Sequence, residues 1–288
     1  MYANYDLDIP QSLDEALDVL ASNKDSATSL LAGGTNLIID IRSKRERPTR
    51  VVGIGGIAEL RGIECTEDRV TLGSGTTVTD LLNSSEIAEA APSIADAARV
   101  FAGHMVRNTA TVGGNIACGS PAADLVPPLM SLDAEVTLTS KSGSRIVALA
   151  DYFTGYKEDV RNDDELITKV AWGRLPKGAV NTFRKLGRRK GDAITVTGVA
   201  VTLVVEDGVC QRARIALGAV APTVFRATGA EALLEGQPIN ADLIDAAAKK
   251  AVEESSPIAD VRASAQYRLH TIETLTRRLL TQATARLG

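Results

Sequence analysis

Cysteine and histidine are scarce in this sequence, which has three cysteines and two histidines in 288 residues. A disulfide framework needs an even and denser set of cysteines, so Cys65, Cys118 and Cys210 are predicted to be buried thiols. His104 and His270 cannot supply the Cys/His spacing of a zinc site, and an iron–sulfur cluster requires about four thiolates. We therefore expect no metal site in this chain, and no catalytic residue of these types.

Aromatic residues make up only 3% of the chain, and the formal net charge is only −4. Nucleic-acid binding is therefore not expected, because base-stacking platforms need aromatic residues and phosphate backbones need a basic field. No apolar run approaches the roughly 20 residues of a membrane span. The acidic N-terminal sequence leads into no apolar segment of a secretory signal, so we expect a cytoplasmic protein.

The chain does have the composition of a globular protein, with 44% apolar and 24% charged residues. Its first third predicts a helix from Ser12 to about Asn23, because a Ser-x-x-Glu capping pattern precedes apolar residues at helical spacing. A buried strand over 28–32 should follow, then a glycine turn and a second helix capped by Thr35 or Asn36. This mixture of helices and strands indicates an α+β fold.

The rest of the chain continues the same mixture in two parts. In the middle part we expect short strands over 69–72, 134–139, 145–148 and 166–172, and a helix over 93–101. The stretch 108–128 is too rich in Gly, Pro, Ser, Thr and Asn to be one regular element. A glycine and proline cluster at 173–178 marks a lobe boundary. Beyond it we expect three long strands, over 181–186, 193–205 and 211–220, and then helices, the last over about 263–285.

Two glycine pairs are each followed by a short polar side chain, in the segments 31–36 and 110–115. Turns without side chains let backbone N–H groups converge on an anion, and Thr or Asn adds further donors. The two turns together could hold a diphosphate, although composition alone favours purely structural turns. A third segment, 53–58, fits the loose dinucleotide pattern G-x-G-x-x-A. Gly62 interrupts the helix that should follow it, so a flexible turn is favoured there.

A larger set of motifs accompanies the two glycine turns. It consists of Phe101-Ala102-Gly103, Ser120-Pro121-Ala122-Ala123-Asp124, Pro127-Pro128-Leu129-Met130 and Phe183-Arg184-Lys185-Leu186-Gly187-Arg188-Arg189. In combination these motifs resemble the FAD-binding medium subunit of the molybdenum hydroxylases, the family of xanthine dehydrogenase and carbon monoxide dehydrogenase. The resemblance covers essentially the whole chain.

The resemblance implies a fold and a division into domains. The expected fold is a two-subdomain FAD-binding fold of the vanillyl-alcohol-oxidase/PCMH type, followed by a C-terminal α+β domain with a three-stranded antiparallel sheet and a helical bundle. The FAD-binding domain is expected at 1–175, with subdomains at about 1–55 and 56–175. The C-terminal domain of the CO-dehydrogenase-flavoprotein type is expected at 178–286.

Position by position, the resemblance also implies a set of cofactor contacts. The set is Leu31, Ala32, Gly33, Gly34, Thr35, Asn36, Phe101, Thr111, Val112, Gly113, Gly114, Asn115, Asp124, Ile167 and Lys185. The carboxylate of Asp124 can accept hydrogen bonds from sugar hydroxyls, and Lys185 can stabilise negative charge on reduced flavin. Without the resemblance, Lys185 with Arg188 and Arg189 indicates a solvated charge cluster at a strand end.

The chain departs from the family pattern at Ala193, where some carbon monoxide dehydrogenase relatives carry a tyrosine that packs on the flavin ring. We expect the flavin face either to be more open or to be covered by Ile194. Within the C-terminal domain, only the segment 185–194 is expected to reach the cofactor. The remainder is expected to cover the flavin and to dock partner subunits.

The resemblance implies an electron-transfer subunit rather than a complete enzyme. FAD is the cofactor expected in this chain, whereas molybdopterin and [2Fe-2S] clusters belong to a large and a small partner subunit, commonly in a dimer of heterotrimers. Electrons would pass from the clusters through FAD to an external acceptor such as a quinone, oxygen or NAD. Two alternatives stay open: a self-standing FAD-dependent oxidoreductase of the same fold, and a non-flavin module that binds a nucleotide or phosphosugar.

Overall fold

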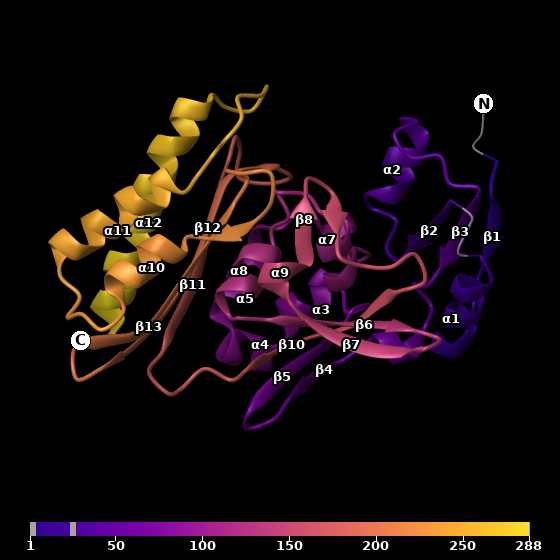
Figure 1. The fold of residues 1–288 in the computed structure, drawn as a ribbon, viewed down its shortest axis with the longest axis horizontal. Coiled ribbons are helices and arrows are strands. Elements are labelled where there is room, and N and C mark those ends of the chain that lie inside the picture. The colour runs from indigo at the N-terminus through magenta and orange to yellow at the C-terminus, as the bar shows by residue number, and fades with distance from the viewer. Residues whose placement is uncertain (1–3, 24–26, 288) are drawn as a thin grey trace.

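The computed structural model describes residues 4–23 and 27–287 and arranges them in three lobes, which follow one another along the long axis of the molecule (Figure 1). The first lobe contains a parallel three-stranded sheet of order β1-β3-β2. Its elements are β1 (Asp6–Asp8), α1 (Leu13–Ser22), β2 (Thr28–Leu31), α2 (Leu37–Arg42) and β3 (Arg50–Gly53). Apolar residues of α1 and β3 form the small core of this lobe.

The local predictions for the first lobe are largely confirmed. α1 begins after Ser12, whose hydroxyl accepts a hydrogen bond from the Glu15 N–H, so the predicted N-cap is present. Asn36 stands at the N-cap of α2, but its side chain makes no capping bond there. β2 is only half-buried, contrary to the predicted buried strand, because residues 28–30 border a cavity.

The middle lobe is built on an antiparallel five-stranded sheet of order β4-β5-β10-β6-β7. Its elements are η1 (Ala58–Leu60), β4 (Ile63–Cys65), β5 (Arg69–Gly73), α3 (Val78–Asn83), α4 (Ser85–Ala90), α5 (Pro92–Val100), α6 (His104–Arg107), α7 (Val112–Ala117), α8 (Val126–Ser131), β6 (Glu135–Ser140), β7 (Gly143–Ala148), α9 (Leu149–Tyr152), β8 (Phe153–Gly155), β9 (Glu158–Asp159) and β10 (Leu166–Gly173). The predicted irregular stretch 108–128 contains the short helix α7 and the beginning of α8. The segment 53–58 is a turn, as favoured from the sequence, and leads only into the 3₁₀ turn η1.

The C-terminal lobe places helices on one side of an antiparallel sheet of order β11-β12-β13-β14. Its elements are β11 (Val180–Gly187), β12 (Thr195–Glu206), β13 (Val209–Gly218), β14 (Phe225–Arg226), α10 (Thr228–Leu234), α11 (Ala241–Glu253) and α12 (Ala265–Leu287). The three long strands are confirmed, but the predicted three-stranded sheet is wrong by one strand. β14 has two residues and is defined only by its pairing with β13, so no periodicity could reveal it.

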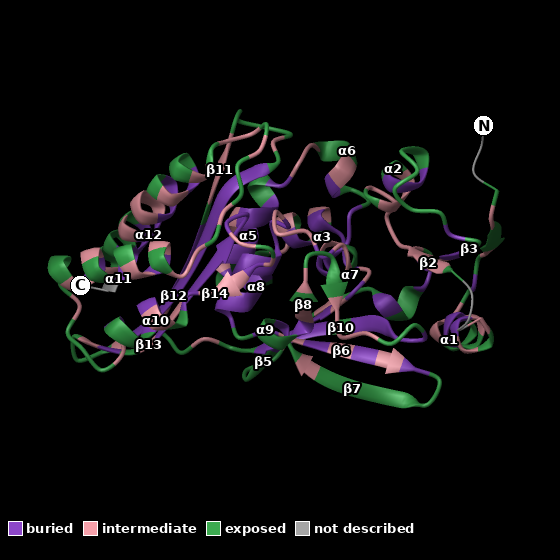
Figure 2. Cartoon of the chain, turned by 45° about the horizontal axis from the view of Figure 1, so that its top comes forward, coloured by how far each residue is buried: buried purple, intermediate pink, exposed green. Residues whose placement is uncertain are grey.

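Both faces of this sheet are covered, as the burial colours show (Figure 2). On one face, Phe183, Ala200 and Ala216 join the core of the middle lobe. On the other face, alternate residues of β12 and β13 pack against α10, α11 and α12. A strand that is buried on both faces has a continuous apolar sequence instead of an alternating one. The sequence of β12 is of this continuous kind. No helix in the described ranges is long and apolar enough to cross a membrane.

Candidate functional site

A cavity of about 1340 Å³ lies where the three lobes meet, and residues of all three line it. It exceeds the roughly 300–1,000 Å³ of a typical small-ligand site, so it suits an elongated ligand. The predicted contact residues that line it are Ala32, Gly33, Gly34, Thr35, Asn36, Phe101, Thr111, Gly113, Gly114, Asn115, Asp124 and Ile167. The structure therefore brings together nearly the whole set chosen from the sequence.

Three predicted residues do not line this cavity. Leu31 is the last residue of β2 and packs under the turn that follows. Val112 is fully buried in the core of the middle lobe. Lys185 has a side chain only 5% exposed, which excludes the solvated charge cluster suggested by its sequence neighbours.

The first glycine turn, 32–36, presents unpaired backbone donors to the cavity. Within the described part of the chain, none of the N–H groups of residues 33–37 donates to another protein group. Gly34 has a φ of +70°, which turns the chain so that successive N–H groups can point to one side. This turn therefore has the donor set that a phosphate or diphosphate requires.

Gly33 is needed for a second reason, which is close packing. A Cβ placed on Gly33 would lie 1.8 Å from the Thr109 carbonyl oxygen. The two glycine turns therefore touch through their backbones, and this contact brings 32–36 beside 110–115. Gly33 therefore has a structural role in addition to its place in the cavity wall.

The second glycine turn differs from the first, because the N–H groups of residues 112–115 are already bonded. Val112 and Gly113 donate to the carbonyls of Thr76 and Ser74, and Gly114 donates to the Thr111 hydroxyl. Residues 112–115 therefore have no unbonded N–H group to offer to a diphosphate, unlike residues 33–37 of the first turn. What it offers is an open surface at Gly114, where a Cβ would meet only the Thr111 Oγ1, at 2.9 Å, among the described residues.

A third glycine, Gly55, belongs to the cavity and was missed in the sequence. A Cβ at Gly55 would lie 2.8 Å from the Ala32 carbonyl oxygen, so the turn 53–56 packs against the first glycine turn. The pattern G-x-G-x-x-A drew attention to this segment for a different fold. The contact with Ala32 that explains the glycine at position 55 cannot be recognised from the local sequence.

Asp124 is the buried carboxylate of the cavity wall, and both of its oxygens are bonded. The Lys185 ammonium lies 2.5 Å from Oδ2, and the Thr195 hydroxyl donates to Oδ1. Burial raises the pKa of Asp124 above its ordinary value, and the charge and hydrogen bond of Lys185 and the bond from Thr195 oppose that shift. Asp124 thus lines the cavity, whereas Lys185 lies behind it.

The aromatic part of the wall, Phe101, is held by a buried guanidinium. Arg107 donates from Nη1 to the Phe101 carbonyl at 2.8 Å and to the Ala102 carbonyl at 3.0 Å. Ala102 has a φ of +34°, a conformation that L-residues rarely adopt. Arg107 therefore stabilises an unusual turn that places Phe101 and Ala102 in the cavity wall.

The C-terminal lobe contributes more of the wall than the predicted segment 185–194. Ala193 and Ile194 do line the cavity, and Ile194 is 55% exposed. The wall also includes Thr195, Arg268 of α12 and the loop before it, so more of the C-terminal lobe borders the cavity than the segment predicted to reach the cofactor. Arg268 is buried and donates to the carbonyls of Val196 and Ala219, which ties α12 to the sheet edge at the cavity.

Sequence reasoning also missed a charged cluster beside the first glycine turn. Asp40 of α2 is buried and lines the cavity. It accepts a hydrogen bond from the Asn36 amide at 2.7 Å and pairs with Arg45 at 3.1 Å and Lys157 at 3.4 Å. Its spacing of four from Asn36 on one helical turn was the available signal.

Neither histidine lines the cavity, and both are exposed. Within the described ranges, no three His, Cys, Asp or Glu side chains form a group that could hold a metal ion. Of the cysteines, Cys210 is buried, whereas Cys65 and Cys118 are half-buried. Cys118 alone among the three lines the cavity.

We expect bound FAD to slow alkylation of Cys118 about tenfold or more, because the cofactor would cover this thiol. Burial raises the pKa of the thiols of Cys65 and Cys118, and raises that of Cys210 to about 11, so all three should react slowly. Peptide-level mass spectrometry after iodoacetamide treatment, with and without FAD, measures the effect. Cys65 is the internal control, and equal protection of Cys65 and Cys118 would contradict the prediction.

The chemistry of the wall fits FAD. The first glycine turn supplies donors for a diphosphate, Gly114 leaves a surface that any side chain would fill, and Asp124 offers acceptor positions to hydroxyl groups. Phe101 supplies an apolar aromatic surface. No side-chain constellation for acid–base or nucleophilic catalysis was found beside these features in the described wall.

Comparisons with known proteins agree with this assignment. The family description "FAD binding domain in molybdopterin dehydrogenase" matches residues 3–176, and "CO dehydrogenase flavoprotein C-terminal domain" matches residues 181–283. The chain is 33% identical over 279 residues to the xanthine dehydrogenase FAD-binding subunit of Escherichia coli O157:H7, which covers 96% of this chain and 95% of that subunit. It is 31% identical to the carbon monoxide dehydrogenase medium chain of Hydrogenophaga pseudoflava, with 96% of each chain covered.

Solved structures show the same relationship. A chain of carbon monoxide dehydrogenase from Hydrogenophaga pseudoflava matches all of this chain with a TM-score of 0.95, at 31% identity over 100% of both chains. A chain of quinoline 2-oxidoreductase from Pseudomonas putida 86 matches with a TM-score of 0.90, at 26% identity, covering 99% of this chain and 98% of that one. The chain therefore belongs to the family of FAD-binding medium subunits of the molybdenum-containing dehydrogenases, the oxidoreductases that include xanthine dehydrogenase and carbon monoxide dehydrogenase.

Proposed function

We propose that this chain is the electron-transfer subunit of a molybdenum hydroxylase. It takes electrons from the [2Fe-2S] clusters of a small partner subunit and delivers them to an external acceptor. Bound FAD supplies the electron exchange that no side chain of the cavity can supply. The large partner subunit carries molybdenum and oxidises the substrate, and the complex is a cytoplasmic dimer of heterotrimers.

The observation that carries this proposal is the composition of the cavity wall. It combines free N–H donors at 33–37, an open surface at Gly114 and the neutralised carboxylate of Asp124, but no acid–base or nucleophilic group in catalytic geometry. Such a wall binds and orients a cofactor without doing chemistry on a substrate. The names of the relatives, as FAD-binding subunits or medium chains, support the role of one subunit among several.

Within the proposed site, this chain's residues would divide the work of binding. The turn 32–36 would hold the diphosphate, and Thr111 to Asn115 would lie along the ribityl chain. Asp124 would accept hydrogen bonds from hydroxyl groups, and Phe101, Ala193 and Ile194 would border the flavin ring. With Ala193 in place of a tyrosine, the exposed Ile194 is the side chain available to cover that face.

Isolation of the full chain at native expression level tests the proposal. We expect one FAD per chain, co-purification of an iron–sulfur subunit and a molybdenum subunit, and no bleaching of the isolated chain's flavin by candidate organic substrates. Bleaching by substrate without partners would instead support the self-standing oxidoreductase. A folded chain that takes up no FAD when FAD is supplied would contradict both and favour the non-flavin module.

A further inference from the structure

The carboxylate of Asp124 is fixed by two side chains that come from the other domain. Asp124 lies in the loop before α8, within the segment matched by the FAD-binding family description. Lys185 of β11 and Thr195 of β12 lie within the C-terminal description, 61 and 71 residues further along the chain. One carboxylate oxygen is bound by each of them.

This bonding leaves Asp124 with a defined face toward the cavity. A carboxylate has about four acceptor positions, and Lys185 and Thr195 occupy one on each oxygen. The remaining acceptor positions are available toward the cavity, because the Asp124 side chain lines it although it is only 9% exposed. Lys185 also neutralises the carboxylate charge, so the wall offers acceptors to a ligand without strong repulsion of its phosphates.

Lys185 makes a second contact that concerns the same wall. Its ammonium also donates to the Val100 carbonyl at 3.4 Å, at the C-terminal end of α5. The next residue is Phe101, which lines the cavity. One buried ammonium therefore ties together the Asp124 loop and the segment that carries Phe101.

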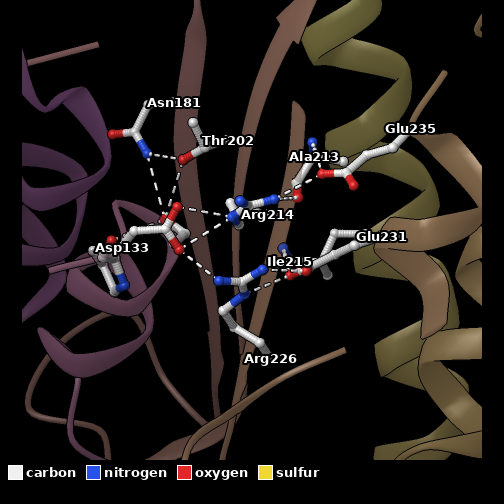
Figure 3. A network of polar contacts seen from close by, with 11 residues as sticks. Asp133, Asn181, Thr202, Ala213, Arg214, Ile215, Arg226, Glu231 and Glu235 are labelled. Atoms are coloured by element: carbon white, nitrogen blue, oxygen red, sulfur yellow. Dashed lines mark hydrogen bonds and ion pairs between the residues drawn. The ribbon is translucent and has the colours of Figure 1, made fainter. Parts of the chain in front are cut away.

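A second charged contact joins the same two domains away from the cavity (Figure 3). Asp133 follows α8 and pairs with Arg214 of β13, at 2.8 Å, and with Arg226 of β14. These arginines continue to Glu235 and Glu231, respectively. None of these five side chains lines the cavity, and Asp133 is 36% exposed. Among the described residues, the Asp124 and Asp133 clusters both join the two domains, and of these two only the Asp124 cluster is part of the cavity wall.

We propose that Lys185 and Thr195 are positioning residues that hold the Asp124 carboxylate in one orientation, so that the docked C-terminal domain completes the FAD site. This inference rests on the proposed function, because it takes FAD as the ligand of the cavity. It assigns Lys185 a positioning role that acts through its bonds to Asp124 and to the Val100 carbonyl. The C-terminal domain is then part of the binding site and not only its cover.

Thr195 borders the cavity as well as bonding Asp124, and substitutions there test that bond without changing any charge. In the full chain, Thr195→Val removes the bond to Asp124 with little change of volume, and Thr195→Ser keeps the hydroxyl. We expect Thr195→Val to raise the FAD dissociation constant by roughly tenfold or more and to alter the visible circular dichroism of the flavin. Thr195→Ser should restore both to near wild-type values.

Lys185→Met tests the ion pair, and Asp124→Asn/Lys185→Met tests it without leaving a buried charge. We expect Lys185→Met to lose more FAD affinity relative to wild type than the double variant loses relative to Asp124→Asn. The reason is that the single variant leaves an unpaired buried carboxylate, which is the larger disturbance. Asp133→Asn is the matched control. It removes an interdomain ion pair remote from the cavity, so it should lower thermal stability without changing FAD affinity beyond twofold.

The outcomes separate the two levels of the proposal. A wild-type chain that binds no FAD would overturn the proposed function and this inference together. A wild-type chain that binds FAD, with Thr195→Val equal to it in affinity and circular dichroism, would overturn the inference alone. Equal loss of affinity in Asp133→Asn and Thr195→Val would also overturn it, because any weakening of domain docking would then have the same effect.

Discussion

Gly33→Ala should destabilise the folded chain by about 3 kcal/mol or more and remove most of its FAD. The new Cβ would lie 1.8 Å from the Thr109 carbonyl oxygen and 2.4 Å from its carbon, which are backbone atoms that cannot rotate away. The first glycine turn must then separate from the second, and the cavity wall between them opens. Urea unfolding measures the loss of stability, and the flavin absorbance of the purified variant measures the loss of cofactor.

Gly56→Ala is the matched control for this variant. Gly56 stands in the neighbouring turn, and apart from its two chain neighbours no described residue has an atom within 4 Å of the position of its Cβ. Its stability should stay within about 0.5 kcal/mol of wild type. A Gly33→Ala variant with wild-type stability and FAD content would show that the two turns are not in fixed contact and do not form one cavity wall.

Elements with a local physical signal were predictable from the sequence. The start of α1 was predictable because the Ser12 hydroxyl accepts a hydrogen bond from the Glu15 N–H only three residues further along the chain. The long strand β12 follows from a continuous run of β-branched and apolar residues, because both of its faces are buried. The observed ends of β11, β12 and β13 differ from the predicted ends by one or two residues, because strand ends depend on pairing more than on composition.

Elements defined by distant partners were not predictable. β14 exists because two residues pair with β13, and a two-residue strand has no period of its own. The half-burial of β2 depends on the cavity beside it, which requires all three lobes to be in place. Arg268 reaches the cavity only because α12 packs across the edge of the C-terminal sheet.

In the site, too, the sequence indicated which residues belong to the wall but not what each of them does there. The glycine turns and Asp124, predicted as cofactor contacts from family motifs, lie in the cavity wall. Their roles depended on neighbours far away in the chain: Thr109 for Gly33, and Lys185 for Asp124. A glycine can be needed for a ligand, for a positive φ or for close packing, and only the structure distinguishes these three reasons.

Gly114→Val should remove most FAD binding while the fold stays intact, which distinguishes it from Gly33→Ala. A Cβ at Gly114 meets only the Thr111 Oγ1 among the described residues, and the residue lines the cavity. Moving that hydroxyl gives up the N-cap bond of α7, about 1 kcal/mol, and replacing a helical glycine returns part of this. The valine methyl groups then occupy space that the cofactor needs. We expect the dissociation constant of FAD to rise at least about a hundredfold, or about 2.8 kcal/mol, in fluorescence titration of the apo chain.

Gly113→Ala provides the comparison, because a Cβ on the adjacent glycine would meet Ser74 instead of open space, although Gly113 also borders the cavity. Its Cβ would lie 2.6 Å from the Ser74 Cβ and 3.0 Å from the Ser74 carbonyl oxygen, so it should lower stability before it lowers affinity. Side by side, the two variants should separate the two measurements: urea midpoint for Gly113→Ala and FAD affinity for Gly114→Val. A Gly114→Val chain that unfolds like wild type and still binds FAD with wild-type affinity would show that the cofactor does not approach α7, because a branched side chain at that position could not then share its space.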